Sequence, residues 1–140
     1  MWEASIGLNG WLTSGTFGFT PMHQMGHVLS ARYNATHGAT LACMMPAWMR
    51  HFANREDNQR YQMFAERIFG CGIQEAADKF EQIMKDHGVQ TRISLFGVNE
   101  QDIPSLVDDV VSVSFGPDGM LNGRPKTSRK DIEEIYRLAL

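Results

Sequence analysis

Apolar residues repeat with a helical period along most of this sequence. The clearest stripe starts at Tyr61 and continues at i, i+3, i+4, i+7 and i+8 to Phe69. A second stripe runs from Ile73 to Met84 and is closed by Gly88, a residue type that suits the position after a helix. The spacing predicts two amphipathic helices, and we expect their apolar stripes to bury one another.

Three more helices are predicted in the first part of the chain. Near-helical spacing over residues 2–12 predicts one, and the proline that opens residues 21–33 suits the first turn of another. The nearly continuous apolar run over residues 37–48 predicts a helix buried on most sides, with Thr36 as its N-cap. Pro46 should kink this helix or shift its end, because proline lacks the N–H that a helix interior needs.

The last third of the chain has a less regular pattern. Residues 89–98 read as extended or loop, and Asn99 is expected to cap a helix. The β-branched alternation over residues 110–115 would also suit a strand, but no second strand pattern is near enough to pair with it. Thr127 or Ser128 caps a last helix. The sequence therefore predicts an all-α fold, a helical bundle of about six or seven helices.

Composition agrees with a single helical domain over residues 1–140. The chain is 43% hydrophobic and 21% charged, which is enough apolar material for one core. Its net charge is −3 and it has no Lys/Arg cluster, so neither nucleic acid nor a membrane surface is an expected partner. It has no apolar run of membrane-spanning length and no signal-peptide pattern, so we expect a cytoplasmic protein. Cys43 and Cys71 are then expected to be free thiols.

Clustered histidines are the most informative chemical feature. His23, His27 and His37 lie within fifteen residues. His23 and His27 are i and i+4 and so share a helix face, and the short break before residue 37 allows His37 to return toward them. Converging imidazoles suit a borderline divalent cation such as Fe²⁺ or Zn²⁺. The alternative is an exposed or hydrogen-bonded histidine pair without a ligand, because this spacing also arises by chance.

The same segment imitates the H-E-x-x-H helix of metalloproteases, but Gln24 stands where the general base should be. Since an amide cannot accept that proton, protease activity is not expected. Three imidazoles also leave a metal site open, because a stable site usually has a fourth ligand or an oxygen donor. Either a distant acid such as Glu66 folds in, or the missing ligands lie outside this chain.

A wider set of residues carries a resemblance to a known family. The matching positions are 1–2, 7–10, 23–31, 33, 37–42, 46–47, 64–67, 88–94, 96–98, 131–132 and 134–136. Together they resemble the helical domain of iron-containing (group III) alcohol dehydrogenases, in their butanol-dehydrogenase-like, NAD(P)-dependent branch. The most specific element is the pair His23 and His37, fourteen positions apart, with a further histidine four after the first. The resemblance covers nearly the whole chain.

The resemblance implies a dehydroquinate-synthase-like metal-binding domain and a role for each histidine. His23 and His37 would bind a divalent metal, Fe²⁺ or Zn²⁺, together with an Asp and a third His that lie upstream in the family. His27 would be the catalytic and cofactor-binding residue, near the nicotinamide and the substrate, where it helps to move a proton. The chain has no Gly-rich phosphate loop, so NAD(P) would bind through a missing domain.

Two functional hypotheses follow from these observations. The first is that the chain is the C-terminal, metal-binding part of an NAD(P)-dependent alcohol dehydrogenase, which interconverts a small primary alcohol and its aldehyde and is inactive as a fragment. The alternative is a stand-alone helical binding or interaction module with a non-catalytic histidine site. A coding sequence that continues upstream into a phosphate-binding domain would favour the first. Exposed apolar side chains of the first helix, such as Trp2 and Trp11, would favour a homo-oligomer.

Overall fold

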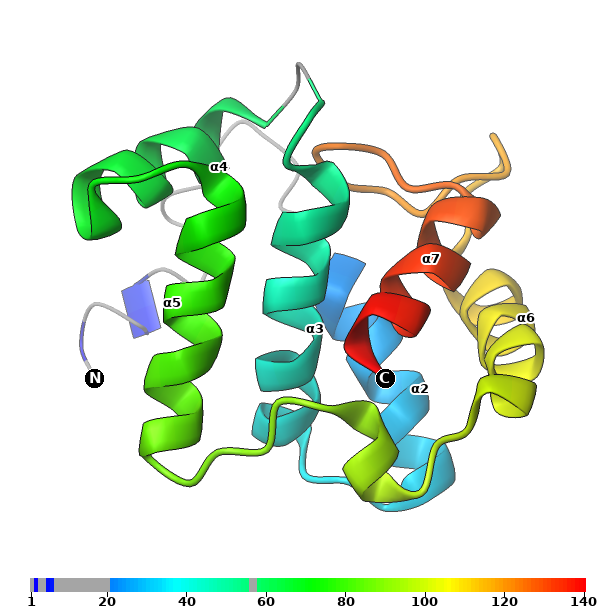
Figure 1. The fold of residues 1–140 in the computed structure, drawn as a ribbon. Helices are drawn as coiled ribbons and strands as arrows, with labels where there is room; N and C mark the ends of the chain where they lie inside the picture. The colour runs from blue at the N-terminus through cyan, green and yellow to red at the C-terminus, as the bar shows by residue number, and fades with distance from the viewer. Residues whose placement is uncertain (1, 3–4, 7–20, 56–57) are drawn as a thin grey trace.

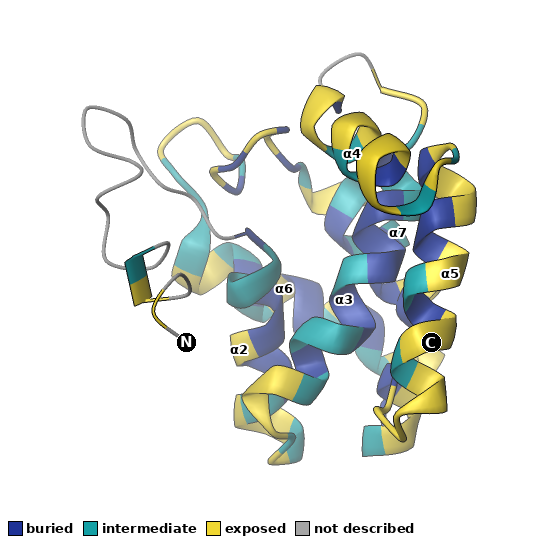
Figure 2. Cartoon of the chain, turned by 90° about the vertical axis from the view of Figure 1, so that its left-hand side faces the viewer, coloured by how far each residue is buried: buried dark blue, intermediate teal, exposed yellow. Residues whose placement is uncertain are grey.

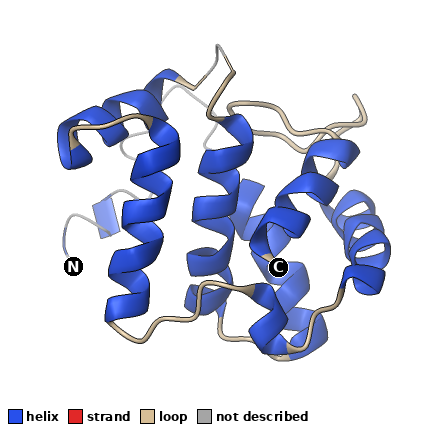
Figure 3. Cartoon of the chain, in the orientation of Figure 1, coloured by secondary structure: helices blue, strands red, loops and turns tan. Residues whose placement is uncertain are grey.

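The computed structural model describes residues 2, 5–6, 21–55 and 58–140, and within them the chain is a bundle of helices (Figure 1). The α-helices are α2 (Pro21–Tyr33), α3 (His37–Phe52), α4 (Gln59–Phe64), α5 (Ile73–Asp86), α6 (Ile103–Ser114) and α7 (Arg129–Ala139). A π-helix, η2 (Ala65–Phe69), extends α4, and two 3₁₀ segments, η3 (Ile93–Phe96) and η4 (Glu100–Asp102), precede α6. The predicted all-α class is confirmed, and Figure 3 shows only helices and loops in the described part.

Only part of the helix predicted over residues 2–12 can be compared with the structure. Residues 2, 5 and 6 are helical, and the rest, Trp11 included, lies outside the described residues. Trp2 is 77% exposed. Of the helices that the structure describes, none is both long and apolar enough to cross a membrane.

Helix α3 occupies the centre of the bundle and contacts α2, α5 and α7 (Figure 1). Trp48 and Phe52 in its second half are completely or almost completely buried, as the apolar run predicts for a helix covered on most sides. Its N-cap is Thr36, as predicted, although the threonine side chain makes no capping hydrogen bond. Pro46 lies inside the helix, which continues to Phe52 and so does not end at the proline.

The prediction that the two apolar stripes bury one another is only partly correct. Ala65 and Phe64 pack with Ile73 in a small core beside α3. Ile68, however, is 65% exposed and Ile83 is 47% exposed. The chain changes from α-helix to π-helix at residue 65, and the longer π turn alters which positions share a face. A stripe read with an α-helical period therefore assigns Ile68 to the wrong side.

The other cluster of buried residues joins α2, α3, α6 and α7 into the main core. Figure 2 shows buried residues along the faces of α2, α3 and α6 that meet, and exposed residues over α4 and α5. Residues 110–114 belong to α6, so the strand alternative is wrong there. The region beyond holds only isolated bridges, from Phe115 to Leu121 and from Leu121 to Thr127.

Two predicted caps are found, one with a change of helix type. Asn99 caps the 3₁₀ segment η4 in a reciprocal capping box with Asp102, and α6 follows directly. Ser128 caps α7 in a second capping box, in which its hydroxyl accepts from the Asp131 N–H. Residues 89–98, predicted as extended or loop, contain the short segment η3.

Candidate metal centre

The three clustered histidines come together at the surface where α2 and α3 meet. The ring centroid of His37 lies 5.1 Å from that of His23 and 4.8 Å from that of His27. The two α2 rings are 6.3 Å apart, one helical turn from each other. The predicted convergence of the three rings is therefore confirmed, whereas their roles as ligands stay a prediction.

A tight connection between the two helices produces this convergence. Helix α2 ends at Tyr33, and Asn34 adopts a left-handed backbone with φ of 50°. Asparagine tolerates this conformation better than most residues, so the chain can reverse within three residues. Thr36 is extended, and His37 is already the first residue of α3. The reversal places the first turn of α3 beside the histidine-bearing face of α2.

The three histidines differ in their exposure to solvent. His27 and His37 are exposed, whereas His23 is half-buried. Burial, followed by the neighbouring His37 and His27 imidazoles, lowers the pKa of His23 below its ordinary value. The neutral form, which is the form that binds metal ions, is thus favoured at His23.

The donors in this cluster fit part of a metal site. Imidazole nitrogens bind Zn²⁺ at about 2 Å, so two rings that share one ion hold their centroids roughly 5 Å apart. His23 and His37 show this separation. Among the described residues, however, no group of three or more His, Cys, Asp or Glu side chains is arranged to hold an ion. Further ligands would have to come from outside the described part of the chain.

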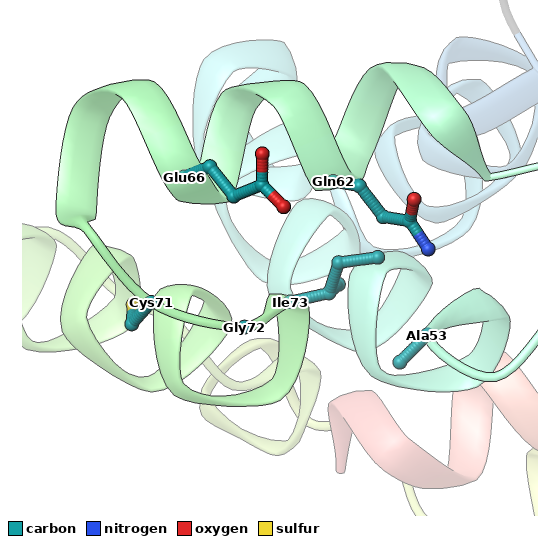
Figure 4. A pocket seen from close by; sticks show the side chains of 6 residues that line it. All are labelled: Ala53, Gln62, Glu66, Cys71, Gly72 and Ile73. Atoms are coloured by element: carbon teal, nitrogen blue, oxygen red, sulfur yellow. The ribbon is translucent and has the colours of Figure 1, made fainter.

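Glu66, the acid considered as an additional ligand, lies elsewhere. It lines a pocket of about 340 Å³ together with Gln62 and Cys71, at the Ala53 end of α3 (Figure 4). His37 starts the same helix sixteen residues earlier, which corresponds to about 24 Å along its axis. The prediction that Glu66 could join the histidines is therefore wrong.

Gln24, which replaces the protease general base, has a structural role. It accepts a hydrogen bond of 2.9 Å from the Ser114 hydroxyl and so links α2 to the end of α6. The sequence pattern did not indicate Ser114, because its partner lies ninety residues away.

Other charged groups hold the helices together away from the histidine cluster. The carboxylate of Glu81 in α5 is buried. It forms ion pairs with three basic side chains, those of Arg50 in α3, Lys85 and Arg92. The Thr91 hydroxyl donates a hydrogen bond to the same carboxylate. Burial alone would raise the pKa of Glu81, but hydrogen bonds from Lys85 and Arg50 and the charges of Arg50 and Arg92 lower it to about 2. Glu81 is therefore an ionised junction between α3, α5 and the following loop.

His51, the remaining histidine of α3, joins that helix to α7. One ring nitrogen lies 2.8 Å from an Asp131 carboxylate oxygen, and the other lies 3.4 Å from Glu134. This histidine is far along α3 from His37 and is part of the packing between helices.

Comparison with known proteins identifies the class to which this helical bundle, with its histidine cluster at the surface, belongs. Residues 10–140 match the model of the Fe-containing alcohol dehydrogenase family, C-terminal part. The chain belongs to this family.

Named relatives include enzymes of known cofactor. NADH-dependent butanol dehydrogenase B of Clostridium acetobutylicum is 28% identical over 98% of this chain and 37% of its own length. The NADPH-dependent aldehyde reductase YqhD of Escherichia coli is 30% identical over 76% of this chain and 29% of its own length. The chain therefore spans about a third of the length of the curated relatives that it matches.

Solved structures agree with the helical arrangement. The crystal structure of NADH-dependent butanol dehydrogenase A from Thermotoga maritima superposes with a TM-score of 0.82 and 35% identity. The superposition covers 99% of this chain and 37% of that one. The bundle is thus similar to one part of a longer enzyme.

Proposed function

We propose that this chain is the metal-binding helical part of an NAD(P)-dependent alcohol dehydrogenase, which interconverts a primary alcohol and its aldehyde. The observation that carries the proposal is the convergence of His23, His27 and His37 at one surface of a chain that belongs to the Fe-containing family. The relatives named for butanol and for aldehydes support a small alcohol or aldehyde as the substrate class.

In this proposal His23 and His37 hold the divalent ion, Fe²⁺ or Zn²⁺, through neutral imidazole nitrogens. Because these histidines are on two different helices, the packing of α2 on α3 sets the distance between their rings. The remaining ligands lie outside the described residues. When bound, the ion would supply Lewis-acid polarisation of the alcohol or carbonyl oxygen.

His27 is the proposed proton-carrying group. Its ring is exposed and lies 4.8 Å from the His37 ring, close enough to face the same substrate. Oxidation of an alcohol by NAD(P)⁺ transfers a hydride from carbon and releases the hydroxyl proton. An imidazole ring nitrogen can accept that proton in oxidation and return it in reduction.

The dinucleotide is proposed to bind to a domain outside this chain. The sequence has no Gly-rich phosphate loop, and the match is to the C-terminal part of the family. Hydride transfer requires the nicotinamide carbon to lie against the substrate carbon, and such positioning contributes roughly 7–11 kcal/mol to lowering a barrier. We therefore propose that the 140-residue chain alone does not catalyse the reaction.

A chimera tests the proposal. The chain replaces the matching C-terminal part of Clostridium butanol dehydrogenase B, and butanol oxidation and butyraldehyde reduction are measured with both dinucleotides after addition of Fe²⁺ or Zn²⁺. We expect activity from the chimera, none from the chain alone, and loss of metal and activity in the chimera carrying His37→Ala. A folded chimera that binds metal through these histidines without turnover would instead support the non-catalytic module.

A further inference from the structure

Helices α2 and α3 pack tightly against each other at a glycine, Gly26. A methyl group placed on the Cα atom of Gly26 would lie 2.8 Å from the Thr40 hydroxyl oxygen and 3.4 Å from a methyl group of Leu41. The first distance is shorter than real contacts allow, so no larger residue fits at position 26 unless a helix or Thr40 moves. Gly26 and Thr40 are both buried, and Thr40 has no exposed surface at all.

The position of this contact relative to the histidines is the same on both helices. Gly26 follows His23 by three residues, and Thr40 follows His37 by three residues. Residues three apart lie on neighbouring positions of one helix side. Each of the two residues is therefore one turn away from the histidine on its own helix, and both are buried.

Thr40 cannot easily turn away from Gly26. Its hydroxyl donates a hydrogen bond of 2.8 Å to the backbone carbonyl of His37. Rotation about the Thr40 side-chain bond would break that hydrogen bond inside a fully buried site, and a β-branched side chain has few other rotamers. The hydroxyl thus presents a fixed surface to α2 and also contacts the backbone of the histidine that starts α3.

We infer that Gly26 and Thr40 are positioning residues, which set the separation of α2 and α3 and thereby the distance from His37 to His23 and His27. The inference rests on the proposed function for its consequence, namely that the separation controls metal affinity. A wider spacing would leave each imidazole in place on its own helix but spoil the distance across the helices. Gly26 is thus required for close approach rather than for backbone conformation.

The chain offers a matched set of variants. Gly26→Ala introduces the clash, and Gly26→Ala combined with Thr40→Ala removes the oxygen that causes it, since the Thr40 Cβ atom would then be at an ordinary 3.6 Å. Gly38→Ala is the control, because position 38 is in the same first turn as His37 and a Cβ atom there meets nothing within 4 Å.

The first measurement uses no metal. In nuclear Overhauser spectra of the 140-residue chain, we expect cross-peaks between the His23 and His37 rings to weaken severalfold in Gly26→Ala, to persist in Gly38→Ala, and to return in the double variant. The second measurement is a Zn²⁺ titration by calorimetry. We expect the affinity for Zn²⁺ to be about tenfold weaker in Gly26→Ala than in the unmodified chain, and to be unchanged in Gly38→Ala and in the double variant. If Gly26→Ala does not fold, Thr40→Val should show the loss, because a methyl group larger than the hydroxyl then faces Gly26, and Thr40→Ser, which keeps the hydroxyl, should not.

The outcomes separate this inference from the proposed function. Unchanged ring contacts and unchanged Zn²⁺ affinity in folded Gly26→Ala would overturn the positioning role even if the unmodified chain binds zinc. Ring contacts that respond as expected, in a chimera that binds no metal, would support the positioning role and contradict the proposed function.

Discussion

The phenolic hydroxyl of Tyr136 donates a hydrogen bond of 3.0 Å to the backbone carbonyl of Met25. This contact joins the last helix to the turn of α2 that lies between His23 and His27. Both residues are completely buried, and burial raises the pKa of the Tyr136 phenol, so the hydroxyl stays protonated and able to donate. Helix α7 therefore supports the histidine-bearing helix α2 from its buried side.

Tyr136→Phe removes this donor without changing the shape of the ring. We expect the free energy of unfolding to fall by about 1 kcal/mol, because the Met25 carbonyl loses a partner in a buried place. Urea unfolding followed by circular dichroism measures the change. Tyr33→Phe is the comparison: the Tyr33 hydroxyl hydrogen-bonds to Asp102, but both residues are only half-buried, so water can replace the lost contact and the loss should be smaller. Equal losses in the two variants would contradict a special role for the Tyr136 hydroxyl.

The lowered pKa of Glu81 should make the free energy of unfolding depend on pH. Its pKa is about 2 in the folded chain against an ordinary value of 4.5, so the unfolded chain binds the proton more tightly. Its contribution is then complete above about pH 4.5 and is lost as the pH falls toward 2. Glu81→Gln should lower stability at pH 7 by about 2 kcal/mol and flatten this acid dependence.

Urea unfolding at several pH values between 7 and 2.5 provides the measurement for Glu81. Glu75→Gln is the matched control on the same helix, because Glu75 pairs with Lys79 at the surface and such pairs contribute at most about 1 kcal/mol. An acid dependence in Glu81→Gln as steep as that of the unmodified chain would show that other carboxylates dominate.

The two cysteines should differ in reactivity. Cys43 is 1% exposed, and burial raises the pKa of its thiol to about 12, so almost no thiolate is present at pH 8. Cys71 is half-buried and borders the pocket beside Glu66. Iodoacetamide under native conditions should label Cys71 alone, as read by peptide mass spectrometry, and both thiols after unfolding in urea. Labelling of Cys43 as fast as Cys71 in the folded chain would contradict the burial of Cys43 in the core.

The cap of α7 gives a further test. Ser128→Ala removes the hydroxyl that accepts from the Asp131 N–H at 3.2 Å, and we expect a loss of about 1 kcal/mol. Ser112→Ala within α6 is the control, because its hydroxyl makes only an exposed bond to the carbonyl of Asp109. Thermal melts of both variants should show a lower midpoint for Ser128→Ala only.

Local signals in the sequence were sufficient for the features that depend on neighbours along the chain. The end of α2, the start of α3 after Thr36 and the cap at Ser128 follow from turn and capping chemistry. The convergence of the histidines was also predictable, because a three-residue connection leaves few ways to pack two helices. Ile68 was misplaced because a π-helix has no distinct periodic signature in so short a segment.

Contacts between distant residues could not be predicted in this way. The partners of Tyr136 and Ser114 lie 111 and 90 residues away, and no local pattern specifies them. The close approach at Gly26 is similar, since a glycine inside a helical pattern has several possible meanings until the neighbouring helix is known.

The support that α7 gives to α2 and α3 sets an order of events during biosynthesis. Helix α3 packs on α7, and Tyr136 of α7 comes 111 residues after its partner Met25. Until α7 has left the ribosome, α2 and α3 have been made but lack the cover that α7 provides. The main core therefore closes only once α7 is available, and a chain that stops before residue 128 would have the histidines without the scaffold that holds them in place.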